Sequence, residues 1–334
     1  MLKKKRLGQF YTTNCKYILK DLNIPPYIQN IIEPFAGNGD LLNFVRKKNV
    51  ECYDIDPRHS YIKKRDTLLN PPKYRDKFII TNPPFLARNK SDNKEIFDKY
   101  GENDLYKCFL RNLITNKSLG GILIIPLNFW CSIRKKDRKL RSDFLKIYNI
   151  LNLNIFEEQV FNDTKCPISS FDYEIKNEER LINVNIYPKL INFEVKLTEL
   201  NNYMIGGEIY NLIPNKRYKI GRLTKKGEKS SNIRMKCIDD NKKNKLGLSI
   251  VEDGDIYMDG TKDNSSRSYG CLVIVPCLSL DVQKDLVIRF NKLVEDYREK
   301  YYSLFLSNYR ESKDICRKRI SFDLVYKIVG YLLL

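Results

Sequence analysis

Apolar residues follow two patterns along the first 190 or so positions of the chain. Short continuous runs predict strands, and these cover residues 30–35, 50–55, 77–82, 120–127 and 149–156. Apolar residues at three- and four-residue steps predict helices over residues 39–48 and 104–117. Strands that alternate with helices favour a mostly parallel sheet with helices on both faces, and ligands bind such sheets at the carboxyl ends of the strands.

The pattern changes after residue 195. Short runs predict strands over residues 208–213, 247–252 and 270–276, and helical spacing returns over residues 284–306 and 320–334. Residues 216–245 hold twelve Lys or Arg and three acidic residues. We therefore predict two domains, residues 1–195 and residues 196–334.

The first predicted strand ends at Glu33, and the sequence IEPFAGNGD places Gly37 and Gly39 directly behind it. Glycines at this point let the backbone approach a bound ligand closely. A dinucleotide-binding loop would carry a third glycine at position 42, where this chain has Leu42. Taken alone, the loop suits a tight turn as well as a cofactor site.

Acidic residues also follow the next two predicted strand ends, with Asp54 in VECYDIDP and Asp66 in KKRDTLL. Each acid by itself is typical of a solvated or capping residue, but three at successive strand ends indicate a ligand site. A carboxylate near the position of Asp54 suits two ribose hydroxyls. Because the loop has no basic residue for a pyrophosphate, S-adenosylmethionine fits the pattern better than a dinucleotide does.

A second candidate site is the loop FIITNPPFLA (residues 78–87). Prolines are common where strands stop, so a turn would explain it. However, Asn82 before a proline is held extended, and neither proline carries an N–H. The loop thus offers the Asn82 side-chain oxygen and the Pro83 carbonyl as acceptors beside the Phe85 ring. An exocyclic amine on a flat base matches them, and accepting its protons would turn the nitrogen lone pair toward a methyl sulfonium.

The net charge of +19 adds a polyanionic partner to this picture, nucleic acid before an anionic membrane surface. The single His and nine Cys without CxxC spacing predict no metal site and reduced thiols, as in a cytosol-like compartment. No apolar stretch reaches the ~18 residues of a membrane helix. The basic N-terminus lacks the apolar core of a secretory signal.

Together these motifs resemble those of N6-adenine DNA methyltransferases of the gamma group, which belong to restriction–modification systems. LGQFYTT resembles the family's N-terminal cofactor motif, and IEPFAGNGD, YDIDP, RDTLL, TNPPF, DLYKCFL and GGILIIPLNFW follow in the family's order. VFNDTKCPISSF (160–171) is similar to the motif whose aromatic residue faces the flipped base. The resemblance covers about residues 7–175.

The resemblance implies a Rossmann-like S-adenosylmethionine-dependent methyltransferase sheet followed by a smaller C-terminal α+β target-recognition domain. It implies double-stranded DNA as substrate, S-adenosylhomocysteine as product and no metal. A cognate restriction endonuclease would share the recognition sequence without forming a stable complex. The cofactor-binding residues that it implies are Tyr11, Thr12, Thr13, Glu33, Pro34, Phe35, Ala36, Gly37, Asp54, Ile55, Asp66, Thr67 and Asn82. The catalytic residues would be Asn82, Pro83, Pro84 and Phe85, with Phe85 and Phe161 stacking on the target base.

DNA phosphates are expected to contact two groups of basic residues. These are Arg134, Lys135 and Lys136 in SIRKKDRKLRSDF, and Arg217, Lys225 and Lys226 in the basic run. A solvated helix face is the alternative for the first group, but its place beside a substrate opening favours phosphate contacts. We expect a cytoplasmic protein of a bacterium, or a viral protein acting in a host cell.

Other functions remain open from the sequence. The same loop suits an RNA adenine-N6 or guanine-N2 methyltransferase. A protein glutamine substrate would not call for the positive charge, and a non-enzymatic basic DNA-binding protein is disfavoured because Asn82, Pro83 and Phe85 are all present. Cytosine-C5 methylation is disfavoured because Cys166 and Pro167 stand in the reverse of the Pro–Cys order.

Overall fold

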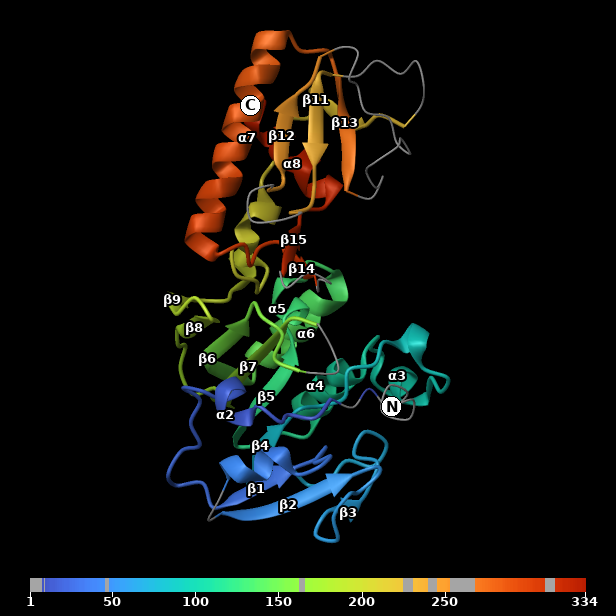
Figure 1. Cartoon of the computed structure of the whole chain (residues 1–334), viewed down its shortest axis with the longest axis vertical. Coiled ribbons are helices and arrows are strands. Elements are labelled where there is room, and N and C mark those ends of the chain that lie inside the picture. Colours follow the sequence, from blue (N-terminus) through green and yellow to red (C-terminus); the bar gives the residue numbers. More distant parts are fainter. Residues whose placement is uncertain are drawn as a thin grey trace. The chain divides into compact units, whose positions relative to one another are not determined.

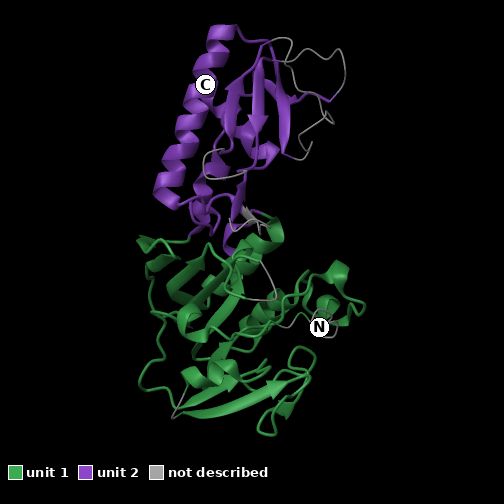
Figure 2. Cartoon of the chain, in the orientation of Figure 1, with its two compact units in different colours: residues 1–129, 134–197, 310–314 green, residues 130–133, 198–309, 315–334 purple. Residues whose placement is uncertain are grey.

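The computed structural model describes residue 8 and residues 10–45, 48–161, 166–224, 231–239, 245–252, 268–309 and 316–334. The chain divides into two compact units (Figure 2). Unit 1 comprises residues 1–129, 134–197 and 310–314, and unit 2 comprises residues 130–133, 198–309 and 315–334. The predicted domain boundary at 195/196 lies beside the division at 197/198, and the functions assigned to the two domains remain predictions.

Unit 1 is built on a nine-stranded sheet with the spatial order β3-β2-β1-β4-β5-β7-β6-β8-β9 (Figure 1). The strands are β1 (Asn30–Glu33), β2 (Asn49–Asp54), β3 (Lys63–Lys64), β4 (Phe78–Thr81), β5 (Gly120–Pro126), β6 (Tyr148–Phe156), β7 (Ile168–Ile175), β8 (Ile182–Tyr187) and β9 (Ile191–Val195). Strands β1 to β5 are parallel, and β7 lies antiparallel between β5 and β6. Because β1 lies between β2 and β4, the residues at their carboxyl ends come together.

Helical elements cover both faces of this sheet. On one face, α2 (Cys15–Ile18) and the 3₁₀ helix η1 (Asp40–Phe44) contribute to a core that includes Ile80 and Ile122. On the other face are α4 (Leu105–Thr115) and α6 (Lys135–Leu145), and Phe144 of α6 packs against Phe171 of β7 with ring centroids 6.3 Å apart. The register pairs Phe171 with Leu123, the neighbour of Ile122, so the two packing surfaces lie on opposite faces. The predicted α/β fold class is confirmed.

The helix predicted over residues 39–48 is wrong in type and in length. Among the described residues of this segment, the structure has the five-residue 3₁₀ helix η1, which begins after left-handed Gly39 (φ 77°), and the chain enters β2 at Asn49. Other helices in the described part of this region are η2 (Arg88–Lys90), α3 (Glu95–Tyr100) and α5 (Asn128–Cys131).

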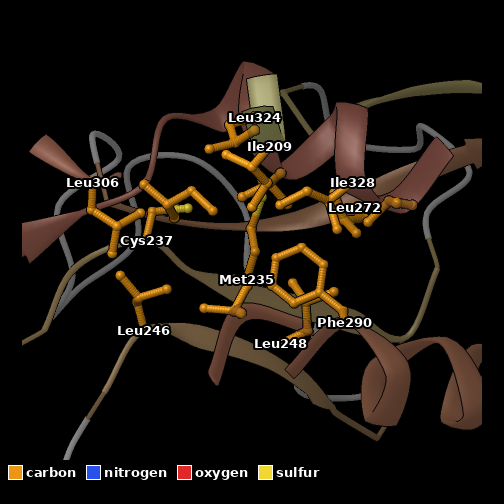
Figure 3. Close-up of a cluster of buried hydrophobic side chains, with 14 of the residues drawn as sticks. Ile209, Met235, Cys237, Leu246, Leu248, Leu272, Phe290, Leu306, Leu324 and Ile328 are labelled. Carbon is orange, nitrogen blue, oxygen red and sulfur yellow. The ribbon is translucent and has the colours of Figure 1, made fainter. Parts of the chain in front are cut away.

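Unit 2 contains an antiparallel sheet with the order β10-β13-β11-β12. Its elements are η3 (Glu199–Asn201), η4 (Gly207–Asn211), β10 (Lys219–Arg222), β11 (Ile233–Lys236), β12 (Gly247–Ile250), β13 (Tyr269–Val275), α7 (Leu280–Tyr301), β14 (Ser307–Tyr309), β15 (Arg317–Arg319) and α8 (Phe322–Leu332). Met235, Leu248, Phe290 and Ile328 join the sheet to both long helices in one apolar core (Figure 3).

The strand predicted over residues 208–213 is also wrong, since this segment forms η4. Ile209 is fully buried in the unit 2 core, and the Tyr210 hydroxyl donates to the Phe305 carbonyl at 2.8 Å. Tertiary packing of these two neighbouring residues outweighs their β propensity. Among the described residues, no helix has both the length and the apolar character that a membrane crossing needs.

Candidate active site

A cavity of about 310 Å³ lies at the carboxyl ends of β1, β2 and β4, within unit 1. Eight of the thirteen predicted cofactor residues line it, namely Tyr11, Phe35, Gly37, Asp54, Ile55, Asp66, Thr67 and Asn82. Thr12, Thr13, Glu33, Pro34 and Ala36 do not line it. Residues far apart in the sequence therefore meet at the carboxyl ends of the strands, where the sequence pattern predicts a ligand site.

Asp54 at the end of β2 holds the glycine loop. Its Oδ2 accepts the N–H of Gly37 at 2.8 Å, and its Oδ1 accepts the N–H of Asp56 at 2.8 Å. Gly37 is left-handed (φ 53°), and a Cβ there would lie 3.1 Å from the Tyr11 ring. A carboxylate oxygen can accept more than one hydrogen bond, so a carboxylate at this position can shape the loop and also bind a hydroxyl of a ligand.

Glu33 lies directly under this loop and is 1% exposed. Burial, reinforced by the charges of Asp40 and Asp54, raises the pKa of its carboxyl well above the usual range. Its Oε2 is buried and has no hydrogen-bond partner among the described residues. Glu33 thus takes up a proton more readily than an exposed glutamate, and it supplies an unsatisfied polar atom next to the cavity-lining residues.

Asp66 organises the turn that follows β3. Its Oδ1 accepts the N–H groups of Leu68 and Leu69, both at 3.0 Å. The turn is also held by α3, because the Tyr100 hydroxyl donates to the Leu68 carbonyl at 2.7 Å and Lys99 Nζ donates to it at 3.2 Å. The Asp66 carboxylate is therefore fixed at the cavity wall by contacts within the turn and from a helix behind it.

The Asn82 amide is bound at one end only. Its Nδ2 donates to the Phe10 carbonyl at 2.8 Å and to Thr12 Oγ1 at 3.1 Å. Its Oδ1 is buried and has no hydrogen-bond partner among the residues that the structure describes. The residue lines the cavity, so the site contains an amide with both donor hydrogens used and with an acceptor oxygen that has no partner among the described residues.

Aromatic rings gather beside the Asn82 loop. Phe85 stacks on Phe10 with ring centroids 5.5 Å apart, and Phe10 lies 6.4 Å from Phe161. Phe161 is 2% exposed and packs in the core of unit 1, whereas Phe85 is partly buried against the same core. Pro84 lines the cavity, and Pro83 does not. The structure therefore brings Phe85 and Phe161 to one region but leaves their predicted stacking on a base untested.

Asp104 ties the segment behind this loop to the start of α4. Its carboxylate accepts the N–H of Leu86 at 3.2 Å, and burial raises the pKa of the carboxyl to about 6. An unfolded aspartate has a pKa of about 3.9. Between about pH 4 and pH 6 the folded protein therefore keeps a proton that the unfolded chain releases, so the free energy of unfolding falls as the pH rises.

Replacing Asp104 by Asn should remove that fall. Relative to the wild type, the stability of the variant should rise by about 1–3 kcal/mol from pH 4 to pH 6. Urea unfolding of both proteins across this pH range measures the difference in their free energies of unfolding. The other buried acids are present in both proteins, so their contributions cancel in this difference. A variant that keeps the wild-type slope would show that the Asp104 carboxyl titrates like an exposed aspartate.

The predicted phosphate contacts are distributed over both units. Arg134, Lys135 and Lys136 are exposed at the start of α6, where Lys136 Nζ donates to the Gly101 carbonyl at 3.3 Å. Arg217 is exposed in unit 2. Lys225 and Lys226 lie outside the described residues. Within the described ranges, the structure gathers no group of three or more His, Cys, Asp or Glu side chains that could hold a metal ion.

Sequence reasoning missed one wall of the cavity. Ser91, Asp92 and Asn93 line it, followed by Ile96 and Phe97. The polar run SDN (91–93) a few residues after the proline loop was the one sequence feature that could have indicated this wall, and no apolar periodicity predicted a secondary-structure element there. The supporting residues Lys99 and Tyr100 gave no signal, because their role depends on where α3 packs.

A comparison with models of known families gives a match for part of the chain. Residues 61–161 match the family model described as Eco57I restriction-modification methylase. This stretch contains Asp66, the NPPF loop and Phe161. Over the residues that it covers, the chain is similar to methyltransferases of the restriction–modification type. Among curated proteins, none matches the chain in sequence.

Several solved structures are similar to part of this chain. A chain of a type I restriction–modification system has a TM-score of 0.45 and 14% identity, covering 55% of this chain and 46% of that chain. A type I restriction–modification methyltransferase subunit from Streptococcus thermophilus has a TM-score of 0.40 and 11% identity, covering 54% of this chain and 47% of that chain. A nuclease-deletion mutant of the type ISP restriction–modification enzyme LlaGI, solved with a DNA substrate mimic, has a TM-score of 0.42 and 14% identity, covering 68% of this chain and 34% of that chain. The chain spans about half the length of the first two.

Proposed function

We propose that this protein is a DNA methyltransferase that transfers a methyl group from S-adenosylmethionine to the N6 amine of adenine in duplex DNA. The observation that carries the proposal is the Asn82 amide, whose donor hydrogens are both bound and whose acceptor oxygen has no partner among the described residues. An amine that donates its N–H groups while its lone pair turns to an electrophile, and that then loses one proton, needs such an acceptor. The family match over residues 61–161 supports the methyltransferase class.

The residues around the cavity fit S-adenosylmethionine. Asp54 and Asp66 offer carboxylate oxygens for ribose hydroxyls and for an amino-bearing base, and Phe35, Ile55 and Leu68 offer apolar surface to the base. Of the described residues that line the cavity, Asp54, Asp66 and Asp92 are acidic and one, Arg65, is basic, so the charge of this wall disfavours a pyrophosphate. When bound, the cofactor would supply an electrophilic methyl group on a sulfonium.

Asn82 and Pro83 would then act on the target amine. Accepting its two N–H groups draws the nitrogen lone pair out of conjugation with the base, which makes the nitrogen nucleophilic. Acceptors held by the folded loop would need little reorganisation during the reaction. The methylated nitrogen is acidic and releases its proton to water or to Asn82, so no strong general base is needed. This suits a chain with a single histidine.

The target amine lies inside the duplex stack and would have to be flipped out to reach this loop. A direct test incubates the protein with labelled S-adenosylmethionine and either unmethylated duplex DNA or RNA of matched length. Label in DNA that is recovered as N6-methyladenine is the expected result. Label only in RNA would move the substrate class to RNA, and label in neither nucleic acid would contradict the proposal.

A basic surface on unit 2 is suited to the DNA backbone. Side chains alternate along β11, so Arg234 and Lys236 share the sheet face opposite buried Met235. With Lys245 they line a hollow of about 510 Å³. Phosphates held there would release counterions and make DNA affinity fall steeply with salt.

Replacing Arg217, Lys219, Arg234 and Lys236 together by alanine should flatten that salt dependence. Each phosphate contact that is lost should reduce the slope of log affinity against log salt by about 0.9. Fluorescence anisotropy with labelled duplex DNA at several salt concentrations measures the slope. The matched control replaces four exposed residues of unit 1, Lys63, Lys64, Lys73 and Arg75. If the slope of log affinity against log salt decreases by the same amount in both variants, the loss of net charge explains the decrease, and the four unit 2 residues have no special role.

A further inference from the structure

The N-terminal segment Gly8–Thr12 lies against the NPPF loop at both of its ends. At the first end, the Asn82 amide donates to the Phe10 carbonyl and to Thr12 Oγ1. At the other end, the N–H of Phe85 donates to the Gly8 carbonyl at 2.9 Å. The stacked rings of Phe10 and Phe85 lie between these contacts. The segment therefore holds the loop at three points.

Gly8 shows how closely the two backbones approach. It is left-handed (φ +67°), and a Cβ there would lie 2.8 Å from the Phe85 carbonyl oxygen. Because that oxygen belongs to the backbone, it cannot move aside as a flexible side chain would. Only glycine allows the segment to lie this close to the loop.

These contacts determine which end of the Asn82 amide is the acceptor. A carbonyl oxygen can only accept, so the atom facing the Phe10 carbonyl must be Nδ2. Rotating the amide by 180° would place Oδ1 against the Phe10 oxygen, acceptor against acceptor. In the observed orientation both Nδ2 hydrogens are used, and the unsatisfied atom is Oδ1. An unsatisfied buried acceptor is costly, and the segment holds the amide in that state.

Thr12 is the side chain that contributes to this orientation. It is 3% exposed, does not line the cavity, and contacts Asn82 through its hydroxyl. We propose that Thr12 is a positioning residue for methyl transfer, which acts by orienting the Asn82 amide and not by binding the cofactor. This role presupposes the proposed function, because it acts on the acceptor that the target amine would use.

The kinetic test compares Thr12→Val, which removes the hydroxyl at nearly constant shape, with Thr12→Ser, which keeps it. We expect Thr12→Val to lower kcat at least tenfold, while the Kd values for S-adenosylmethionine and DNA stay within twofold. Thr12→Ser should retain at least half of the wild-type kcat. Thr115→Val, at an exposed position of α4, is the matched control and should be unchanged. A Thr12→Val protein with wild-type kcat, or one that is impaired only in cofactor binding, would overturn the proposal.

A double variant separates positioning from general destabilisation. If Thr12 acts through Asn82, then Thr12→Val should cause no further loss of rate in an Asn82→Ala protein. Additive losses would show that Thr12 supports activity by another route. If Thr12→Val does not fold, Thr12→Ala is used in the same comparison.

A measurement on the resting protein does not depend on activity. In ¹⁵N-labelled wild-type protein, the Asn82 side-chain amide, assigned by its absence in Asn82→Ala, should exchange its protons slowly because both are hydrogen-bonded. In Thr12→Val the exchange should be at least tenfold faster. Rapid exchange in the wild type, or equal exchange in both proteins, would overturn the proposal. If the wild type methylates no DNA, the proposed function fails, but slow wild-type exchange that Thr12→Val accelerates would still support the orienting contact.

Discussion

Replacing Asn82 by alanine should lower the single-turnover rate of methyl transfer by roughly three orders of magnitude, the loss expected when one preorganised hydrogen-bonding group is removed. Alanine cannot accept a proton of the target amine, so the nitrogen lone pair stays conjugated with the base. The amide is part-buried and, among the described residues, its hydrogen bonds go to Phe10 and Thr12 of the N-terminal segment, so its removal should leave the cavity wall largely in place. Rapid-quench assays with excess enzyme and labelled S-adenosylmethionine measure the rate.

Binding measurements decide whether this loss is chemical. Calorimetry with S-adenosylmethionine and anisotropy with duplex DNA should give Kd values within a fewfold of the wild type. Asn82→Asp provides a second comparison. Its carboxylate has no N–H to donate, so an oxygen would face the Phe10 carbonyl oxygen and the contact that orients the side chain would be lost. An Asn82→Ala protein that methylates at near the wild-type rate would show that the NPPF loop is only a turn.

Replacing Asp54 by alanine should weaken S-adenosylmethionine binding by about 1–3 kcal/mol, which is a roughly 5- to 150-fold higher Kd. Two effects add in this variant. A ligand hydroxyl loses a charged acceptor, and the N–H groups of Gly37 and Asp56 lose the carboxylate that holds the glycine loop. Isothermal calorimetry measures the affinity without requiring turnover.

Glu51 provides the matched control on the same strand. Its carboxylate bonds to Lys77 at 2.6 Å and to the Tyr53 hydroxyl at 3.0 Å, and it does not line the cavity. Glu51→Ala should keep the wild-type cofactor affinity. Asp54→Asn retains one acceptor oxygen and should fall between Asp54→Ala and the wild type. Unchanged affinity in Asp54→Ala would remove Asp54 from the cofactor site.

Five of the nine strands in the sheet of the first unit could be predicted from the sequence, because each of the five is a short apolar run. All five predicted runs correspond to strands, namely β1, β2, β4, β5 and β6. Predictions failed where packing outweighed local preference. Residues 208–213 read as a strand, but burying Ile209 and bonding Tyr210 to Phe305 favour a helical turn. Strand β9 (Ile191–Val195) was not predicted, because an edge strand with half-exposed residues has no apolar run.

The sequence by itself determined the chemistry available at the strand ends. Residue types, their spacing and the missing N–H groups of Pro83 and Pro84 specify carboxylate and carbonyl acceptors beside an aromatic ring, because these properties belong to the residues wherever they are placed. They were enough to predict that Asp54, Asp66 and Asn82 would meet at one cavity.

Only the tertiary structure decided how those groups are held. The partners of the Asn82 amide lie 72 and 70 residues away in the sequence, at Phe10 and Thr12. The Asp66 turn is supported from α3, and Asp104 has its raised pKa because the surrounding elements bury it. No local pattern encodes such contacts, since an amide's orientation and a carboxyl's pKa depend on which distant atoms the fold brings within hydrogen-bonding distance and how much water it removes.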